Sequence, residues 1–411
     1  MRVLRWVLGI AAAVVLLAVA AVLIATLLVN PDRYRGRIES AVRRETGRPF
    51  VIAGHLRLTW FPWLGMRMGA ARLGAAPGAG GPDLLKWRSA AVRVRLLPLL
   101  LHRRLEVGRI RIDGADLHLS RGLHGRGNWQ DLLARLRSGR GTAAGAPAGN
   151  PARAASLAGL DLANGTLDYV DEATGEYVRL TGWQLRVGPY RAGAPLSVRT
   201  SFVLHAANTR VGGSAAGSKA LVLPAAGVPV ALDVPRLQLK TAPLEVAAPR
   251  WSLQVADAKL RGALHARRDV SGELSASGAL SAAVSSLREL TGALGIGMPA
   301  VEDPAALAAL SLSGSWSYRR GALEVKPLTA RLDSTTLTGW VARSGGAKPL
   351  WRFALEANEV DFGRYLTRSK ARKPLRLPVS ALRALHAEGT IEIARARIAG
   401  TRLKDVRLQV R

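Results

Sequence analysis

The residue types that most often carry out chemistry are scattered along this chain rather than gathered in motifs. Its 411 residues include no cysteine, which excludes disulfides, thiolate metal sites and cysteine nucleophiles. The seven histidines stand apart from one another, and no two have the spacing of a metal-binding motif such as HExxH. We interpret all seven as surface or strand-face residues: His55, His102, His118, His124, His205, His265 and His386.

Two segments resemble known functional loops but lack the residues that those loops need. Residues 212–219 (GGSAAGSK) place the lysine one residue late for a phosphate-binding loop, and no good helix follows. Residues 169–178 (YVDEATGEYV) lack the spacing of a calcium loop, so we interpret them as a β-hairpin with a polar tip. A GxSxG elbow is absent, and nothing singles out a catalytic carboxylate pair among the 29 acidic residues. The sequence therefore predicts no enzyme, and no catalytic, cofactor-binding or metal-binding residues.

The net charge of +30 raises the question of an anionic partner. Many arginines alternate with apolar residues, as in 93–95 and 109–112. Nucleic-acid binders more often gather their basic residues on one element, together with stacking aromatic rings. We therefore expect the solvated face of a sheet, with some attraction to anionic lipid and no nucleic-acid partner.

The N-terminal residues are the first element that could position the rest of the chain. After a short basic stretch at 1–5, residues 6–29 form a run of 24 mostly apolar residues without a charge. As a helix this run would reach about 36 Å, enough for a hydrocarbon core of about 30 Å. A cleavable signal peptide would have a shorter apolar region, and the small-residue triplet at 18–20 lies inside the run. We predict an uncleaved single-pass anchor at 6–29.

The charges that flank this run do not settle its orientation. Two arginines precede it and six follow it by residue 48, a bias that would keep the body of the chain in the cytoplasm. Long domains are nevertheless translocated largely regardless of charge, so other arguments must decide the topology.

Beyond the anchor, the hydrophobic period changes from that of a helix to that of strands. Residues 30–48 predict an amphipathic helix that ends at Gly47 and Pro49. A β region follows at 49–137, and a flexible linker or long loop rich in Ser, Gly, Ala and Pro at 138–156. A second β region covers 157–411. Alternation predicts strands at 92–96, 110–112, 117–119, 253–255, 310–312, 323–325, 391–393 and 406–408.

Helices are predicted to be few. A short one covers 129–136 after an Asn128 cap, another lies at 286–294, and a third starts at 303–305. The fold class is therefore mainly β: a transmembrane helix followed by an elongated, twisted antiparallel sheet. With so few helices to cover its apolar face, such a sheet must curl over itself or enclose an apolar ligand such as acyl chains. A plain β-sandwich would show much the same alternation, and alternation does not tell which strand face lies inside.

Several stretches, in order and spacing, resemble the AsmA family of bacterial envelope proteins. They cover nearly the whole chain: 54–65 (GHLRLTWFPWLG), 164–171 (NGTLDYVD), 287–290 (LREL), 303–307 (DPAAL), 332–339 (LDSTTLTG) and 360–366 (VDFGRYL). This resemblance implies a cell inner-membrane anchor with residues 1–5 in the cytoplasm, a body in the periplasm and a role in outer-membrane biogenesis. It also implies a β-groove that conducts phospholipid between membranes, and no catalytic residues.

Two further expectations come with the resemblance. The alternative function is that of a non-enzymatic scaffold that influences the targeting and insertion of outer-membrane proteins. The family usually continues past the strand at 388–393 into a second conserved region, so we expect the β-groove region 157–411 to be truncated at its C-terminus. The residues that line the groove are not assigned by the resemblance.

Overall fold

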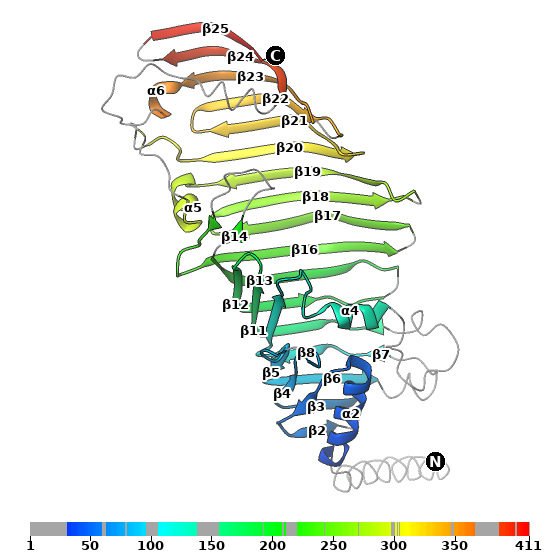
Figure 1. Cartoon of the computed structure of the whole chain (residues 1–411). Coiled ribbons are helices and arrows are strands. Elements are labelled where there is room, and N and C mark those ends of the chain that lie inside the picture. The colour runs from blue at the N-terminus through cyan, green and yellow to red at the C-terminus, as the bar shows by residue number, and fades with distance from the viewer. Residues whose placement is uncertain are drawn as a thin grey trace, which may run out of the picture. The chain divides into compact units, whose positions relative to one another are not determined.

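The computed structural model describes residues 31–59, 63–78, 80–95, 106–137, 156–191, 193–207, 209–210, 220–241, 243–269, 271–296, 301, 303, 305–346, 349–365, 386–398 and 401–410 (Figure 1). The described chain is mainly β with a few short helices, as the sequence predicts. Its contacts divide it into unit 1 (Met1–Ala192 and Ala206–Ala220) and unit 2 (Gly193–His205 and Leu221–Arg411).

Some predicted segments are not among these residues. The predicted anchor at 6–29, the glycine-rich segment 212–219 and nearly all of the predicted linker 138–156 lie outside them. No helix that the structure does describe has both the length and the apolar character needed to cross a membrane.

Unit 1 opens with the predicted amphipathic helix. A 3₁₀ turn, η1 (Pro31–Tyr34), leads into α2 (Arg35–Thr46), which ends at Gly47 in the left-handed region, with a φ of 72°. The other elements of unit 1 are β1 (Phe50–Ile52), β2 (Leu56–Thr59), β3 (Trp63–Met68), β4 (Ala71–Leu73), β5 (Leu85–Trp87), β6 (Ser89–Arg95), β7 (Glu106–Val107), β8 (Ile110–Asp113), β9 (Asp116–Arg121), α4 (Gln130–Arg137), β10 (Ser156–Leu157), β11 (Leu160–Asp171), β12 (Glu176–Val187) and β14 (Thr209–Arg210). The short strand β15 (Ala220–Leu221) lies where the units adjoin in sequence.

Two rows of strands in unit 1 meet at β11. One row runs β2–β3–β6–β8, and β8 pairs with the first half of β11; the other runs β1–β4–β5–β9, and β9 pairs with the second half. The change of partner falls at Asn164 and Gly165, where Asn164 has a φ of 53° and the register with β12 shifts. β11 and β12 form the predicted hairpin, with residues 172–175 as its polar tip.

The core of unit 1 is filled by side chains from both rows and from the helices. Ile52 and Leu56 are 2% and 4% exposed, and Ile38 and Val42 of α2 pack against this core. Gly54 allows two backbone segments to approach, since a Cβ there would lie 2.4 Å from the nitrogen of Ala70. Removal of this apolar surface from water favours folding by about 25 cal/mol per Å².

A fully buried arginine ties the parts of unit 1 together. Arg48 donates to both carboxylate oxygens of Asp131, from Nη2 at 2.6 Å and from Nε at 3.1 Å. It also donates to the carbonyls of Gly74, at 3.3 Å, and Asn128. Burial by itself would raise the pKa of Asp131, but the hydrogen bonds and charge of Arg48 outweigh it and lower that pKa. Arg48 thus joins the end of α2 to β4 and α4.

Unit 2 is built from long strands that pair mostly with their neighbours in sequence (Figure 1). They are β13 (Leu196–Ala207, in unit 2 up to His205), β16 (Val228–Thr241), β17 (Leu244–Val255), β18 (Ala258–Arg268), β19 (Leu274–Val284), β20 (Leu310–Arg319), β21 (Ala322–Leu332), β22 (Thr335–Arg343), β23 (Trp351–Asp361), β24 (Ala387–Ile398) and β25 (Thr401–Val410). Its helices are α5 (Leu287–Ala293) and α6 (Phe362–Tyr365). Every strand predicted by alternation, in either unit, is a strand in the structure over its described residues; residue 96 of the predicted strand 92–96 lies outside them.

The prediction of a wholly antiparallel sheet is wrong at four pairings. In unit 2, β23 pairs in parallel with β24. In unit 1, β10 lies parallel to β7, and β8 and β9 both lie parallel to β11. A parallel pair needs a connection long enough to bring the chain back to the same end of the sheet. Between β23 and β24 this connection is α6 and the residues up to 386; between β9 and β11 it includes α4.

The predicted helices have different outcomes. α5 is confirmed, with Ser286 as an N-cap that accepts a hydrogen bond from the amide of Glu289. α4 is confirmed, but the side chain of Asn128 pairs with the backbone of β9 rather than serving as its cap. The helix predicted to start at 303–305 is wrong: only a turn forms, because Leu307 has a φ of 59° and its amide donates to Asp333.

Candidate functional site

The strand register of unit 2 assigns each side chain to one of two faces. Residues paired across neighbouring strands share a face, and alternate residues of one strand lie on opposite faces. Leu264 of β18 pairs with Gly278 of β19, which pairs with Trp316 of β20, so one apolar row crosses three strands. We call the face that carries it the apolar face; it includes Leu232, Leu253, Leu260, Leu264, Leu280, Leu312, Trp316, Val325, Val341, Phe353, Leu355 and Ile391.

Most of the apolar face is only half-buried in the described structure. Leu264, Leu280, Leu312 and Trp316 have intermediate exposure, whereas a residue between two stacked sheets would be buried. Leu239, Leu244 and Leu274, on the same face, are 47%, 48% and 48% exposed. Contiguous exposed apolar surface of this kind marks a binding site more often than a structural one.

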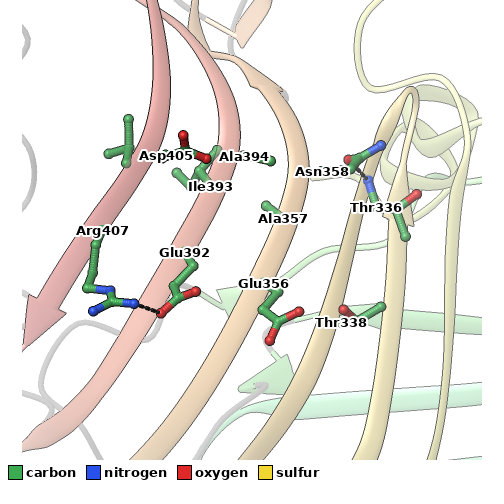
Figure 2. A pocket seen from close by; sticks show the side chains of 11 residues that line it. Thr336, Thr338, Glu356, Ala357, Asn358, Glu392, Ile393, Ala394, Asp405 and Arg407 are labelled. Carbon is green, nitrogen blue, oxygen red and sulfur yellow. Dashed lines mark hydrogen bonds and ion pairs between the residues drawn. The ribbon is translucent and has the colours of Figure 1, made fainter.

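The opposite face of the sheet, the polar face, has a different composition. On β19 and β20 it carries Ser277, Ser281, Ser313 and Ser317. An open hollow of 820 Å³ lies among β22–β25, with Glu356, Glu392 and Arg407 in its wall. Figure 2 shows Glu392 paired with Arg407, at 2.7 Å, and Glu356 on the neighbouring strand. Covering these charged groups with an acyl chain would remove them from water at a cost in free energy, so the apolar face suits a lipid better than this hollow.

Phe362 of α6 covers one part of the apolar face. It packs against the buried Ala357, Ile393 and Ala396. Here the apolar face has a small closed core, and the half-exposed surface begins away from it.

A polar cluster holds α6 in place. Asp333 accepts hydrogen bonds from the amides of Leu307 at 2.8 Å and Ala308 at 2.9 Å, and from the hydroxyl of Tyr365 at 3.1 Å. Burial alone would raise the pKa of Asp333, but the amides of residues 307–309 outweigh it, so that pKa is lowered. Arg364 donates to Asp303 at 2.7 Å. Three of the motif stretches, at 303–307, 332–339 and 360–366, therefore meet at this cluster.

Unit 1 holds a group of potential metal ligands that sequence reasoning missed. One ligand atom each of Asp116, His118 and Asp168 lies within 4.8 Å of the others. The parallel register of β9 and β11 places His118 opposite Asp168, a pairing that the spacing along the chain does not reveal. Asp168 is already bound by Arg179 and by the Tyr177 hydroxyl at 2.9 Å. Burial would raise the pKa of Asp168, yet these partners lower it, so we interpret the group as an ion-pair network.

The sequence left the lining of the expected groove unassigned, and the structure supplies the register that assigns side chains to faces. Alternation within one strand gives two sets of residues, and only the register across strands joins those sets into faces. Large apolar residues at alternate positions were a usable signal, because Trp351, Phe353 and Leu355 all lie on the apolar face.

Comparisons with known proteins agree with the motif analysis. The sequence model of the AsmA family matches residues 1–376. No curated protein and no solved structure matches the chain.

Proposed function

Since the chain belongs to the AsmA family, we propose that it is an inner-membrane-anchored periplasmic protein of outer-membrane biogenesis that binds phospholipid acyl chains on the apolar face of unit 2. Family membership is consistent with envelope biogenesis or lipid transport. The observation that carries the finer proposal is the row of half-exposed apolar side chains that continues from strand to strand. The predicted anchor at 6–29 would tether the chain to a membrane, which is a source of lipid.

The energetics favour acyl chains as the ligand. Each methylene group moved from water to an apolar surface contributes about 0.8 kcal/mol, so contact along several strands adds up over one lipid tail. Leucine, valine and alanine dominate the face, and these side chains give no directional selectivity. We therefore propose that the face binds different acyl chains with similar strength and lets them move along it.

Photo-crosslinking from neighbouring positions on opposite faces tests this proposal. A photoreactive amino acid replaces Leu264 or Leu312 on the apolar face, and Ala263 or Ser313 on the polar face serves as the matched control. In intact cells, phospholipid adducts are expected at positions 264 and 312 and at most weakly at 263 and 313. Equal capture from both faces, or adducts with outer-membrane proteins instead of lipid, would count against the lipid proposal and favour the scaffold alternative.

A further inference from the structure

Unit 1 contains a hollow of 570 Å³ whose wall carries four arginines. Arg67 and Arg93 come from β3 and β6, Arg109 precedes β8, and Arg111 lies within it. The small residues Ala91 and Gly108 leave space between the guanidinium groups. No aromatic ring is among the described residues that line this hollow, so it lacks the stacking surface typical of nucleic-acid sites.

The strand register places these arginines in an unfavourable arrangement. Arg57 of β2 lies directly opposite Arg67 of β3, which pairs with Ala91 of β6, and Ala91 pairs with Arg111 of β8. Like charges directly opposite each other on neighbouring strands destabilise a sheet. An anion bound among them would remove this repulsion.

Two aspartates, Asp113 and Asp161, also line the hollow, and both already pair with arginines. Asp161 has guanidinium nitrogens of Arg109, Arg111 and Arg186 at 2.7, 4.0 and 3.4 Å. Asp113 pairs with Arg88 at 3.1 Å. Within the part of the chain that the structure describes, no ion pair joins Arg57, Arg67 or Arg93 to an acidic residue. The hollow therefore has an excess of positive charge.

We infer that this arginine hollow binds the phosphate of an anionic phospholipid headgroup. Guanidinium groups present paired N–H donors that match phosphate oxygens, and several around one hollow can bind a phosphate jointly. The chain itself favours lipid over free phosphate, because the described part of unit 1 begins at residue 31, close after the apolar run at 6–29. A bilayer surface concentrates anionic headgroups next to basic residues tethered there. This inference rests on the proposed membrane anchor but not on the apolar face of unit 2.

Native mass spectrometry of the full chain in detergent micelles tests the inference with three probes: dioctanoyl phosphatidylglycerol, dioctanoyl phosphatidylcholine and glycerol 3-phosphate. We expect the chain to bind phosphatidylglycerol at least tenfold more tightly than the other two. The double variant Arg67→Glu/Arg93→Glu should lose that preference. Its control, Arg319→Glu/Arg331→Glu, makes the same change of charge on the polar face of unit 2 and should keep it.

Three results would overturn the inference. The first is equal affinity for the two lipids, and the second is an unchanged preference in the Arg67→Glu/Arg93→Glu variant. The third is that glycerol 3-phosphate binds as tightly as phosphatidylglycerol, which would make the ligand a soluble phosphate. Hydrogen exchange in β3 and β6 reports whether the variant is folded; if protection falls there, Arg67→Gln/Arg93→Gln carries the test. Leu264→Asp should weaken the binding of both lipids to the apolar face and leave the preference of the arginine hollow for phosphatidylglycerol intact, which separates the two sites.

Discussion

Replacing Arg48 by alanine should loosen unit 1 more than any exposed substitution. The Arg48 side chain is fully buried and makes two charge-assisted hydrogen bonds to Asp131 and two more to backbone carbonyls. Removing one partner of a buried ion pair costs about 3–5 kcal/mol. Asp131 keeps a side-chain exposure of 38%, so water can solvate its carboxylate in the variant. We therefore expect a loss near the lower end, about 3 kcal/mol.

Hydrogen exchange with mass spectrometry on the full-length protein measures this loss where it occurs. Peptides from α2 and α4 should lose protection that corresponds to about 3 kcal/mol, because Arg48 joins these two helices. Peptides from β16–β22 of unit 2 serve as the internal reference. Arg44→Ala, at an exposed position of α2, is the matched control and should change stability by less than about 0.5 kcal/mol. A loss below about 1 kcal/mol for Arg48→Ala would refute the reasoning.

Three further predictions follow from the hydrogen bonds and backbone geometry. Asp333→Ala should lower stability by about 2 kcal/mol and expose residues 305–309 and α6 to hydrogen exchange. Asp333→Asn should lose less stability, because its amide oxygen still accepts hydrogen bonds and Asn tolerates a positive φ. The pKa of Asp168, like those of Asp131 and Asp333, is lowered in the folded chain. The ionised carboxylate of Asp168 therefore stabilises the fold at neutral pH, and this stabilisation is lost as the pH falls below about 4 through the folded pKa. Urea unfolding between pH 6 and pH 3 should show this decline, with a shallower slope in Asp168→Asn, and a flat profile would contradict it. Gly54→Ala should lower stability by about 1–3 kcal/mol because the added Cβ meets backbone, whereas Gly36→Ala, with open space in α2, should raise stability by up to about 1 kcal/mol. Thermal unfolding compares the two variants, and equal changes in their melting temperatures would disprove the packing argument.

The local part of this fold could be predicted from the sequence, and the long-range part could not. Alternation identified strands such as 310–312, and the helix predicted at 286–294 forms as α5, because both signals depend on neighbouring residues. The helix predicted to start at Asp303 does not form because of a distant residue: Asp333 accepts hydrogen bonds from the amides of Leu307 and Ala308. Asn128 likewise pairs with β9 in place of capping α4.

The candidate sites show the same limit. The apolar face and the arginine hollow both depend on register, and a shift by one residue would move every side chain to the other face. Arg57 and Arg67 are separated by ten positions in the sequence, and only the β2–β3 pairing places them opposite each other. The parallel pairing of β9 and β11 brings His118 and Asp168 together, and no pattern of neighbouring residues predicts that pairing.

The succession of neighbour-paired strands from β16 to β23 has a consequence for how this protein folds and evolves. Within the described residues, each strand from β17 to β23 pairs with the strand before it and the strand after it in sequence. The stability of this part of the sheet is therefore close to a sum of hairpin and nearest-neighbour energies, as in repeat proteins. Growth can then start at any hairpin and spread in both directions, and insertion or deletion of one hairpin changes the length of the sheet without disturbing distant strands. The parallel step from β23 to β24 interrupts that rule. There the chain must first return across the sheet, so the β24–β25 hairpin is a separate kinetic and evolutionary module.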